Sequence, residues 1–159
     1  MGRRAEELAN RIEHGANALA SFAESLTDDE WRRPVLPDGR TVGAIVHHVG
    51  FVYPIEVDLA RTIAAGKPVP VTWADVAQLN AKHARDHAGV GRMEAADFVR
   101  KNGKAAADAV RGFSDADLDR ANSVAMNSNA PLTAQFIIED HALRHSWHHL
   151  AKIRVALGR

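Results

Sequence analysis

Hydrophobic residues recur at helical spacing along most of the chain. Over residues 3–26, apolar positions lie three or four residues apart and charged residues fill the gaps, which is typical of an amphipathic helix with one buried face. The stripe consists of Leu8, Ile12, Leu19, Phe22 and Leu26. Thr27 and Glu30 then form a capping-box pattern that predicts a short helical turn, and Trp31 is expected to plug the end of a helical bundle.

The next hydrophobic stretch predicts a second long helix. Thr41 is expected to cap it, and it should run to about Ala65, where the segment 66–70, rich in glycine and proline, ends it. Pro54 lies inside this span and removes one backbone donor, so a kink is expected there.

Two more helical stretches complete the pattern. One is predicted from a cap at Thr72 to about Phe113, with a kink or break at residues 89–91, Gly-Val-Gly. The other is predicted from about Leu132 to Leu157, with Pro131 in its first turn and Gly158 at its end.

Together these segments predict an all-α fold, a four-helix bundle formed by a single domain over residues 1–159. Residues 122–130 are small and polar and are expected to form a loop, and no segment is a convincing strand. In such bundles, metal and ligand sites are built from side chains on facing helices.

The composition narrows the function further. The chain has 20 Lys and Arg against 20 Asp and Glu, so no strong field is expected to attract nucleic acid or an anionic membrane. It has no cysteine, which excludes disulfides and thiolate ligands, so any thiol chemistry needs an external thiol. The sequence turns charged at once after Met1 and has no apolar run of about 20 residues, so we expect a cytoplasmic protein without a signal peptide or membrane span.

The histidines are the candidates for chemistry. His145 and His149 stand one helical turn apart and therefore on one helix face. On a helical wheel of the second helix, His48 lies roughly 70° from the core direction and His47 roughly 170° from it, so His48 is expected to face the bundle and His47 the solvent. Three such imidazoles suit Zn²⁺, Ni²⁺, Cu²⁺ or Fe²⁺ and leave a coordination position open for water or substrate.

A second pair, His83 and His87, has the same spacing. Lys82, Arg85 and Asp86 surround it, and no third ligand is indicated, so we interpret the pair as part of a solvated helix face.

Other polar and aromatic residues near the histidines have two readings. Glu56, Glu139 and Asp140 are candidate acceptors for imidazole N–H groups, although their positions favour plain surface charges. His141 is either a base beside the site or an exposed side chain, and we expect it to be exposed. Trp147 lies near the apolar stripe and is expected to pack in the core.

Two motifs carry a family resemblance. The stretch 41–48, Thr-Val-Gly-Ala-Ile-Val-His-His, followed by 145–153, His-Ser-Trp-His-His-Leu-Ala-Lys-Ile, resembles the DinB superfamily of helical-bundle proteins over nearly the whole chain. The resemblance implies a four-helix bundle that holds a divalent metal on three histidines. By motif these are His48, His145 and His149, the residues that the spacing also indicates.

The resemblance also implies classes of activity. The superfamily includes S-transferases that use mycothiol, bacillithiol or glutathione, and a branch of maleylpyruvate isomerases. That isomerase branch tends to have a glutamate where this chain has His145, so isomerase activity is not expected. The usual Gly-Gln after the last histidine is replaced by Leu150-Ala151, which also separates this chain from the thiol-transferase members.

The functional prediction is therefore a divalent-metal-binding protein, with Zn²⁺ or Ni²⁺, that acts as a thiol-dependent S-transferase. Its partners would be a low-molecular-weight thiol such as mycothiol and a small electrophile, with no nucleic acid and no membrane. The alternatives are a non-catalytic metal-binding or stress-associated protein and an interaction module that binds no metal. The resemblance also suggests a homodimer.

Overall fold

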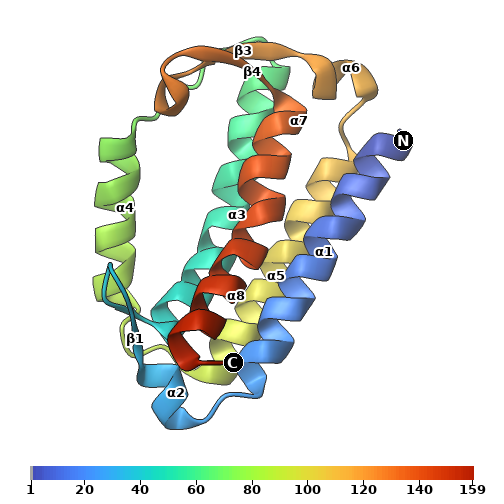
Figure 1. The fold of residues 1–159 in the computed structure, drawn as a ribbon. Coiled ribbons are helices and arrows are strands. Elements are labelled where there is room, and N and C mark those ends of the chain that lie inside the picture. The colour runs from blue at the N-terminus through green and yellow to red at the C-terminus, as the bar shows by residue number, and fades with distance from the viewer. Residues whose placement is uncertain (1) are drawn as a thin grey trace.

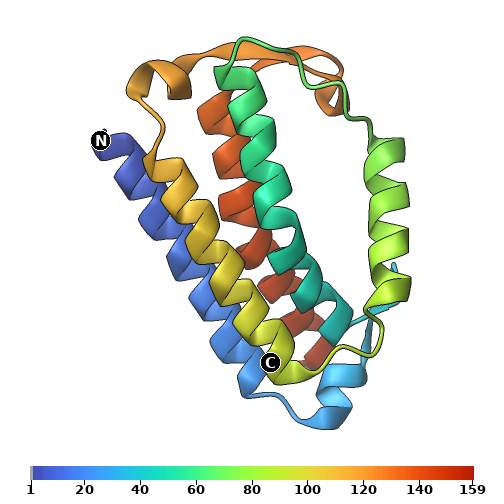
Figure 2. The same cartoon turned by 180° about the vertical axis from the view of Figure 1, so that it is seen from behind.

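Four helical segments form the body of the protein. The computed structural model describes residues 2–159. Helices α3 and α5 run in one direction, and α1 and the C-terminal run of helices go in the opposite direction (Figures 1 and 2). The segments are α1 (Arg3–Glu24), α3 (Val42–Ala64), α5 (Arg92–Arg111) and the continuous run α7 (Ala134–Ile137), η2 (Ile138–Leu143) and α8 (Arg144–Leu157). The predicted four-helix bundle is confirmed.

Short elements close one end of the bundle. Helix α2 (Asp28–Arg32) begins with the predicted capping box of Thr27 and Glu30. Trp31 is buried, and its indole N–H donates a hydrogen bond to the carbonyl oxygen of Val90 at 3.0 Å. The indole therefore plugs the bundle end, as predicted. Beyond it, strand β1 (Pro34–Val35) pairs antiparallel with β2 (Arg40–Thr41).

The predicted third helical stretch is two separate helices. Helix α4 (Trp73–Asp86) begins at the capping box of Thr72 and Asp75, and it ends before the glycine-containing segment that leads to Gly91, the N-cap of α5. Figures 1 and 2 show α4 standing beside the four-helix body, on the side of α3. The expected break at residues 89–91 thus separates α4 from α5, and α4 lies outside the four-helix body.

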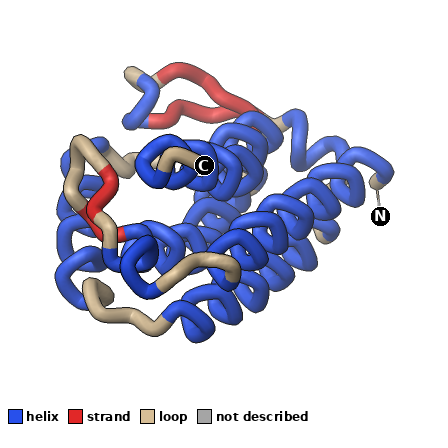
Figure 3. Tube along the Cα trace, turned by 60° about the horizontal axis from the view of Figure 1, so that its bottom comes forward, coloured by secondary structure: helices blue, strands red, loops and turns tan. Residues whose placement is uncertain are grey.

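The segment before the last helix was predicted wrongly. Residues 122–130 were expected to be a loop, but β3 (Ala121–Val124) pairs antiparallel with β4 (Ala130–Thr133), with the short 3-10 turn η1 (Ala125–Asn127) between them. Pro131 lies in β4, not in the first turn of the helix, which starts at Ala134 with Thr133 as its cap. Val69 bridges the outer side of β3, so β4 is the edge strand, where the missing N–H of a proline is tolerated. The two strand pairs, red in Figure 3, lie apart from each other.

Close packing surrounds α3, the helix that carries His47 and His48. All residues from Val42 to Gly50 are buried, because α3 contacts α1, α5, α4 and the C-terminal run. A short helix, α6 (Asp115–Asp119), capped by Ser114, connects α5 to the hairpin. No helix among residues 2–159 is long and apolar enough to cross a membrane.

Candidate metal centre

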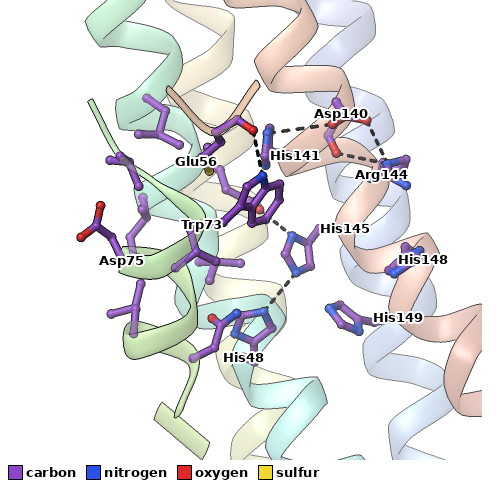
Figure 4. Close-up of a pocket in the computed structure, with 18 of the residues that line it drawn as sticks. His48, Glu56, Trp73, Asp75, Asp140, His141, Arg144, His145, His148 and His149 are labelled. Carbon is purple, nitrogen blue, oxygen red and sulfur yellow. Dashed lines mark hydrogen bonds and ion pairs between the residues drawn. The ribbon is translucent and has the colours of Figure 1, made fainter. Parts of the chain in front are cut away.

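The three histidines selected from the sequence come together in space. Nε2 of His48, on α3, lies 3.1 Å from Nε2 of His145, on α8, and each of His48, His145 and His149 offers a ring nitrogen within 4.8 Å of the other two (Figure 4). Two nitrogens bound to one zinc ion at about 2.1 Å stand roughly 3.0–3.4 Å apart, for angles between a right angle and a tetrahedral one. The spacing therefore suits a single ion, although metal binding itself stays a prediction.

A buried carboxylate orients one of these rings. Nδ1–H of His145 donates to Oε1 of Glu56 at 2.6 Å, because an ionised carboxylate can only accept. This contact directs the lone pair of the opposite nitrogen, Nε2, toward His48, an arrangement that is common at metal-binding histidines. Glu56 is only 4% exposed, so its predicted role as a surface charge is wrong.

The other two acidic candidates do carry out surface roles. Glu139 forms an exposed ion pair with Arg11 at 3.4 Å. Asp140 pairs with Arg144 at 3.1 Å, at the rim of the pocket described below. Neither carboxylate has a hydrogen bond to a histidine of the triad, so Glu56 alone supports the site in this way among the three candidates.

Burial keeps the triad ready to bind a cation. It lowers the pKa of His48 to about 2, with the charge of His145 as the next cause, and it also lowers the pKa of His149 far below its usual range. Both rings are therefore neutral at pH 7, and neutral imidazole is the form that ligates metals. The neutral rings and the orienting carboxylate together make a donor set that fits a divalent metal.

A cavity of about 720 Å³ adjoins the triad. It lies between α3, α4 and the C-terminal helices, and Figure 4 shows the three rings of the triad together with Trp73 of α4 among its lining side chains. Its apolar lining comes from Val52, Ile55, Leu59, Val71, Val76, Leu79 and Met126. Its cationic lining comes from Arg40, Arg144 and Lys152. The carboxylates of Glu56, Asp75 and Asp140 line it as well. The cavity therefore suits a small molecule with an apolar part and a charged group.

The sequence reasoning misplaced two side chains near the site. His141 was expected to be exposed, but it is half-buried and lines the cavity, and its buried Nε2 has no hydrogen-bond partner. Trp147 was expected in the core, but it is 37% exposed and meets the ring of His14 edge-on. The π-helical turn η2 lies directly before α8 and changes the rotation per residue, so a regular wheel fails across it.

A second histidine cluster lies where solvent was expected. Nδ1 of His47 is 2.9 Å from Nε2 of His83, and the His47 ring stacks on Phe98 and on His87. His47 and His83 are buried and His87 is half-buried, so the interpretation of these residues as a solvated face is wrong. The wheel assumed a single buried stripe on α3, but α4 and α5 cover its other side.

The local environment keeps two rings of this second cluster, those of His47 and His83, neutral as well. Burial and, after it, the charge of His87 lower the pKa of His47 to about 4, although the Glu94 carboxylate partly offsets both effects. Burial likewise lowers the pKa of His83 to about 4, with the neighbouring imidazoles adding to the effect.

The fold and the site define a class of protein: a helical bundle in which one histidine from an early helix and an i, i+4 pair from the last helix meet at one cavity. The chain belongs to the DinB superfamily, whose family model matches residues 11–153. This confirms the resemblance inferred from the two histidine motifs.

A solved structure has the same fold. YfiT from Bacillus subtilis is similar to this chain with a TM-score of 0.76 and 16% sequence identity, over 100% of this chain and 89% of that one. That protein is described as a probable metal-dependent hydrolase with an unusual four-helix bundle topology. No functionally curated protein matches the sequence.

Proposed function

We propose that this protein is a divalent-metal-dependent enzyme, with Zn²⁺ or Ni²⁺ on His48, His145 and His149, that transfers a low-molecular-weight thiol such as mycothiol to a small electrophile. One observation carries the proposal: three converging imidazoles line a cavity that is large enough for a small substrate. A bound ion would act as a Lewis acid with an open position, where the pKa of a thiol or of water falls.

The residues of the cavity would bind and orient the two reactants. The apolar wall, with Val52, Val76 and Leu79, would hold the electrophile and exclude water. The cationic side chains of Arg40 and Lys152 would bind the carboxylate groups that small cellular thiols carry. Since the chain has no cysteine, the attacking sulfur must come from the second substrate.

The transfer of the thiol changes no oxidation state, so it needs no oxidant or reductant. A sulfur–carbon bond forms, and the bond from that carbon to its leaving group breaks, with the electron pair departing on the leaving group. The thiol proton needs an acceptor. The imidazole of His141 lines the cavity, and its buried Nε2 makes no hydrogen bond and lies 3.9 Å from the Asp140 carboxylate, so it can take this proton and pass it to solvent.

Hydrolysis is the second candidate. The description of YfiT favours it, and the same imidazole of His141 could accept a proton from an attacking water molecule. In that case an ester or amide would be cleaved, and no thiol would be needed. A protein that binds metal without catalysing any reaction is the remaining alternative.

The test begins with metal content. Protein prepared without a histidine tag should retain stoichiometric Zn²⁺ or Ni²⁺, and His145→Ala and His149→Ala should each lose the ion bound at this triad. The metal-loaded protein is then given a chloronitrobenzene with mycothiol, bacillithiol or glutathione, and separately a nitrophenyl ester without thiol. Thiol-dependent chloride release that the metal-free protein lacks supports transfer, and ester cleavage alone supports hydrolysis. If neither reaction occurs although metal is bound, the enzyme proposal is wrong.

A further inference from the structure

Three histidines outside the first triad form a second group with ligand geometry. His47 of α3 and His83 and His87 at the end of α4 each offer a ring nitrogen within 4.8 Å of the other two. The Nδ1–Nε2 distance of 2.9 Å between His47 and His83 is close to the roughly 3.0–3.4 Å expected for two nitrogens on one ion. In a protein without metal here, one of these two nitrogens must carry the proton that joins them.

The ring positions also resemble those of the first triad. Ring centres in the first triad are 4.7–5.5 Å apart. In the second they are 5.1 Å for His47 and His83, 4.6 Å for His83 and His87, and 4.0 Å for His47 and His87. Two imidazoles on one ion place their centres roughly 5 Å apart. Only the last pair must separate by about 1 Å, and His87 can move because it is half-buried at the end of its helix.

The way α4 is attached points to a ligand rather than to core packing. Of the 14 residues of α4, all of which the structure describes, His83 alone is buried. A helix of this length normally attaches to its domain through an apolar stripe. Here the side chains facing the body, Val76, Leu79 and Asn80, are only half-buried and line the cavity. The end of α4 is therefore held by imidazoles, which make poor hydrophobic anchors.

The surroundings favour a cation at this place. The ligands from α4 lie in its last turn, where the helix dipole attracts positive charge. Glu94, at the start of α5, is close enough for its charge to act on His47. Asp86 acts on His83 in the same way, but it is paired with Lys82, and the positive charge of Arg40 on His83 outweighs it. The carboxylate of Glu94 would offset part of the repulsion between two dications in neighbouring sites.

We infer that His47, His83 and His87 form a second site for a divalent transition metal, which fastens the end of α4 to α3. The site is separate from the first triad, but it shares α3 through the adjacent residues His47 and His48. Since Trp73, Val76 and Leu79 of α4 form one wall of the cavity, an ion here would hold that wall in position. Zn²⁺, Co²⁺ and Ni²⁺ all accept such a set of imidazoles.

The first test counts ions. Tag-free protein is stripped of metal, equilibrated with Zn²⁺ alone, freed of excess and analysed for zinc per chain. The wild type should bind two ions, and His87→Asn, which changes the least buried ligand and so preserves the fold, should bind one. His149→Ala, which removes a ligand of the first triad only, should also bind one, and the double variant should bind none. His14→Asn, an exposed histidine outside both triads, is the control and should bind two.

The second test follows α4 itself. Zn²⁺ should slow hydrogen exchange of the α4 amides in the wild type and in His149→Ala, but not in His87→Asn. A single ion in the wild type that His87→Asn keeps, or a His87→Asn variant that still binds two ions, would overturn the inference and leave the cluster as an ion-free stack on Phe98. Because His149→Ala keeps the second triad intact, failure of the first site and failure of the second give different results.

Discussion

The buried carboxylate of Glu56 offers the sharpest test of the first triad. Glu56→Gln keeps the shape of the side chain and an oxygen that can still accept from Nδ1–H of His145, but it removes the negative charge. The hydrogen bond is then no longer charge-assisted, and the His145 ring becomes a weaker ligand. Loss of such an outer carboxylate typically weakens metal binding about 10–100-fold. This corresponds to roughly 1.4–2.7 kcal/mol of binding free energy.

The same substitution should have the opposite effect on the metal-free protein. The second oxygen of Glu56 is buried without a hydrogen-bond partner, so part of the cost of burying this charge is not compensated. A neutral amide lowers that cost, and the free energy of unfolding without metal should stay equal or rise. Weaker metal binding together with undiminished metal-free stability separates a role in ligand orientation from a role in folding.

The assay is a competition titration of metal-free protein against a chromophoric zinc chelator, combined with urea unfolding in the presence of EDTA. Asp58→Asn is the matched control, because Asp58 lies two residues further along α3 and pairs with Arg61 on the surface. A control within twofold of the wild type is expected. If Glu56→Gln also binds zinc within twofold of the wild type, the proposed coupling between this carboxylate and the metal is refuted.

Three further outcomes are expected. Gly103→Ala should lower the free energy of unfolding, measured in urea, by about 1–2 kcal/mol. The new Cβ would lie 2.4 Å from the Cβ of Ala16, and this overpacking outweighs the gain in helix propensity. The control Gly89→Ala has open space around it and should change the free energy of unfolding by less than about 0.5 kcal/mol. Metal-free protein should lose stability as the pH falls from about 6.5 to 4, by up to about 1.4 kcal/mol per pH unit for each of the two histidines. The pKa values of His47 and His83 are lowered in the folded state, so only the unfolded chain takes up protons in that range. A free energy of unfolding in urea that does not change with pH would contradict this. Removal of metal with EDTA should lower the melting temperature measured by circular dichroism, since an ion present at 1,000 times its Kd adds about 4 kcal/mol to the folded state, and an unchanged melting temperature would count against any bound metal.

The features that could be predicted from the sequence are those determined by neighbouring residues along the chain. His145 and His149 could be paired because one helix turn separates them, and the cap at Thr41 placed His48 on a helix of known start. The fold class followed from apolar spacing in the same way. Each of these features is decided within about ten residues of chain.

The features that were missed depend on contacts between distant segments. His83 is buried because α4 packs back on α3, which no spacing within α4 reveals. Glu56 looked like a surface charge until its contact with His145, 89 residues away, was seen. His141 turns into the cavity because of the π-helical turn η2, and such turns leave no clear pattern in a single sequence. The adjacent pair His47-His48, set against two i, i+4 pairs, was the one signal that could have suggested a second cluster.

Two glycines explain how α3 can serve both clusters at once. A Cβ at Gly43 would lie 2.7 Å from the Trp31 ring, and one at Gly50 would lie 2.8 Å from Phe98, so both neighbours approach the helix more closely than any side chain would allow. Phe98 in turn stacks on His47. His47 and His48 therefore lie between two close packing contacts, Gly43 with Trp31 and Gly50 with Phe98, that do not involve a metal. Because packing already orders the backbone of this segment, metal binding would have little ordering left to do on α3. At the cluster of His47, His83 and His87, the entropic cost of binding would therefore fall mainly on α4.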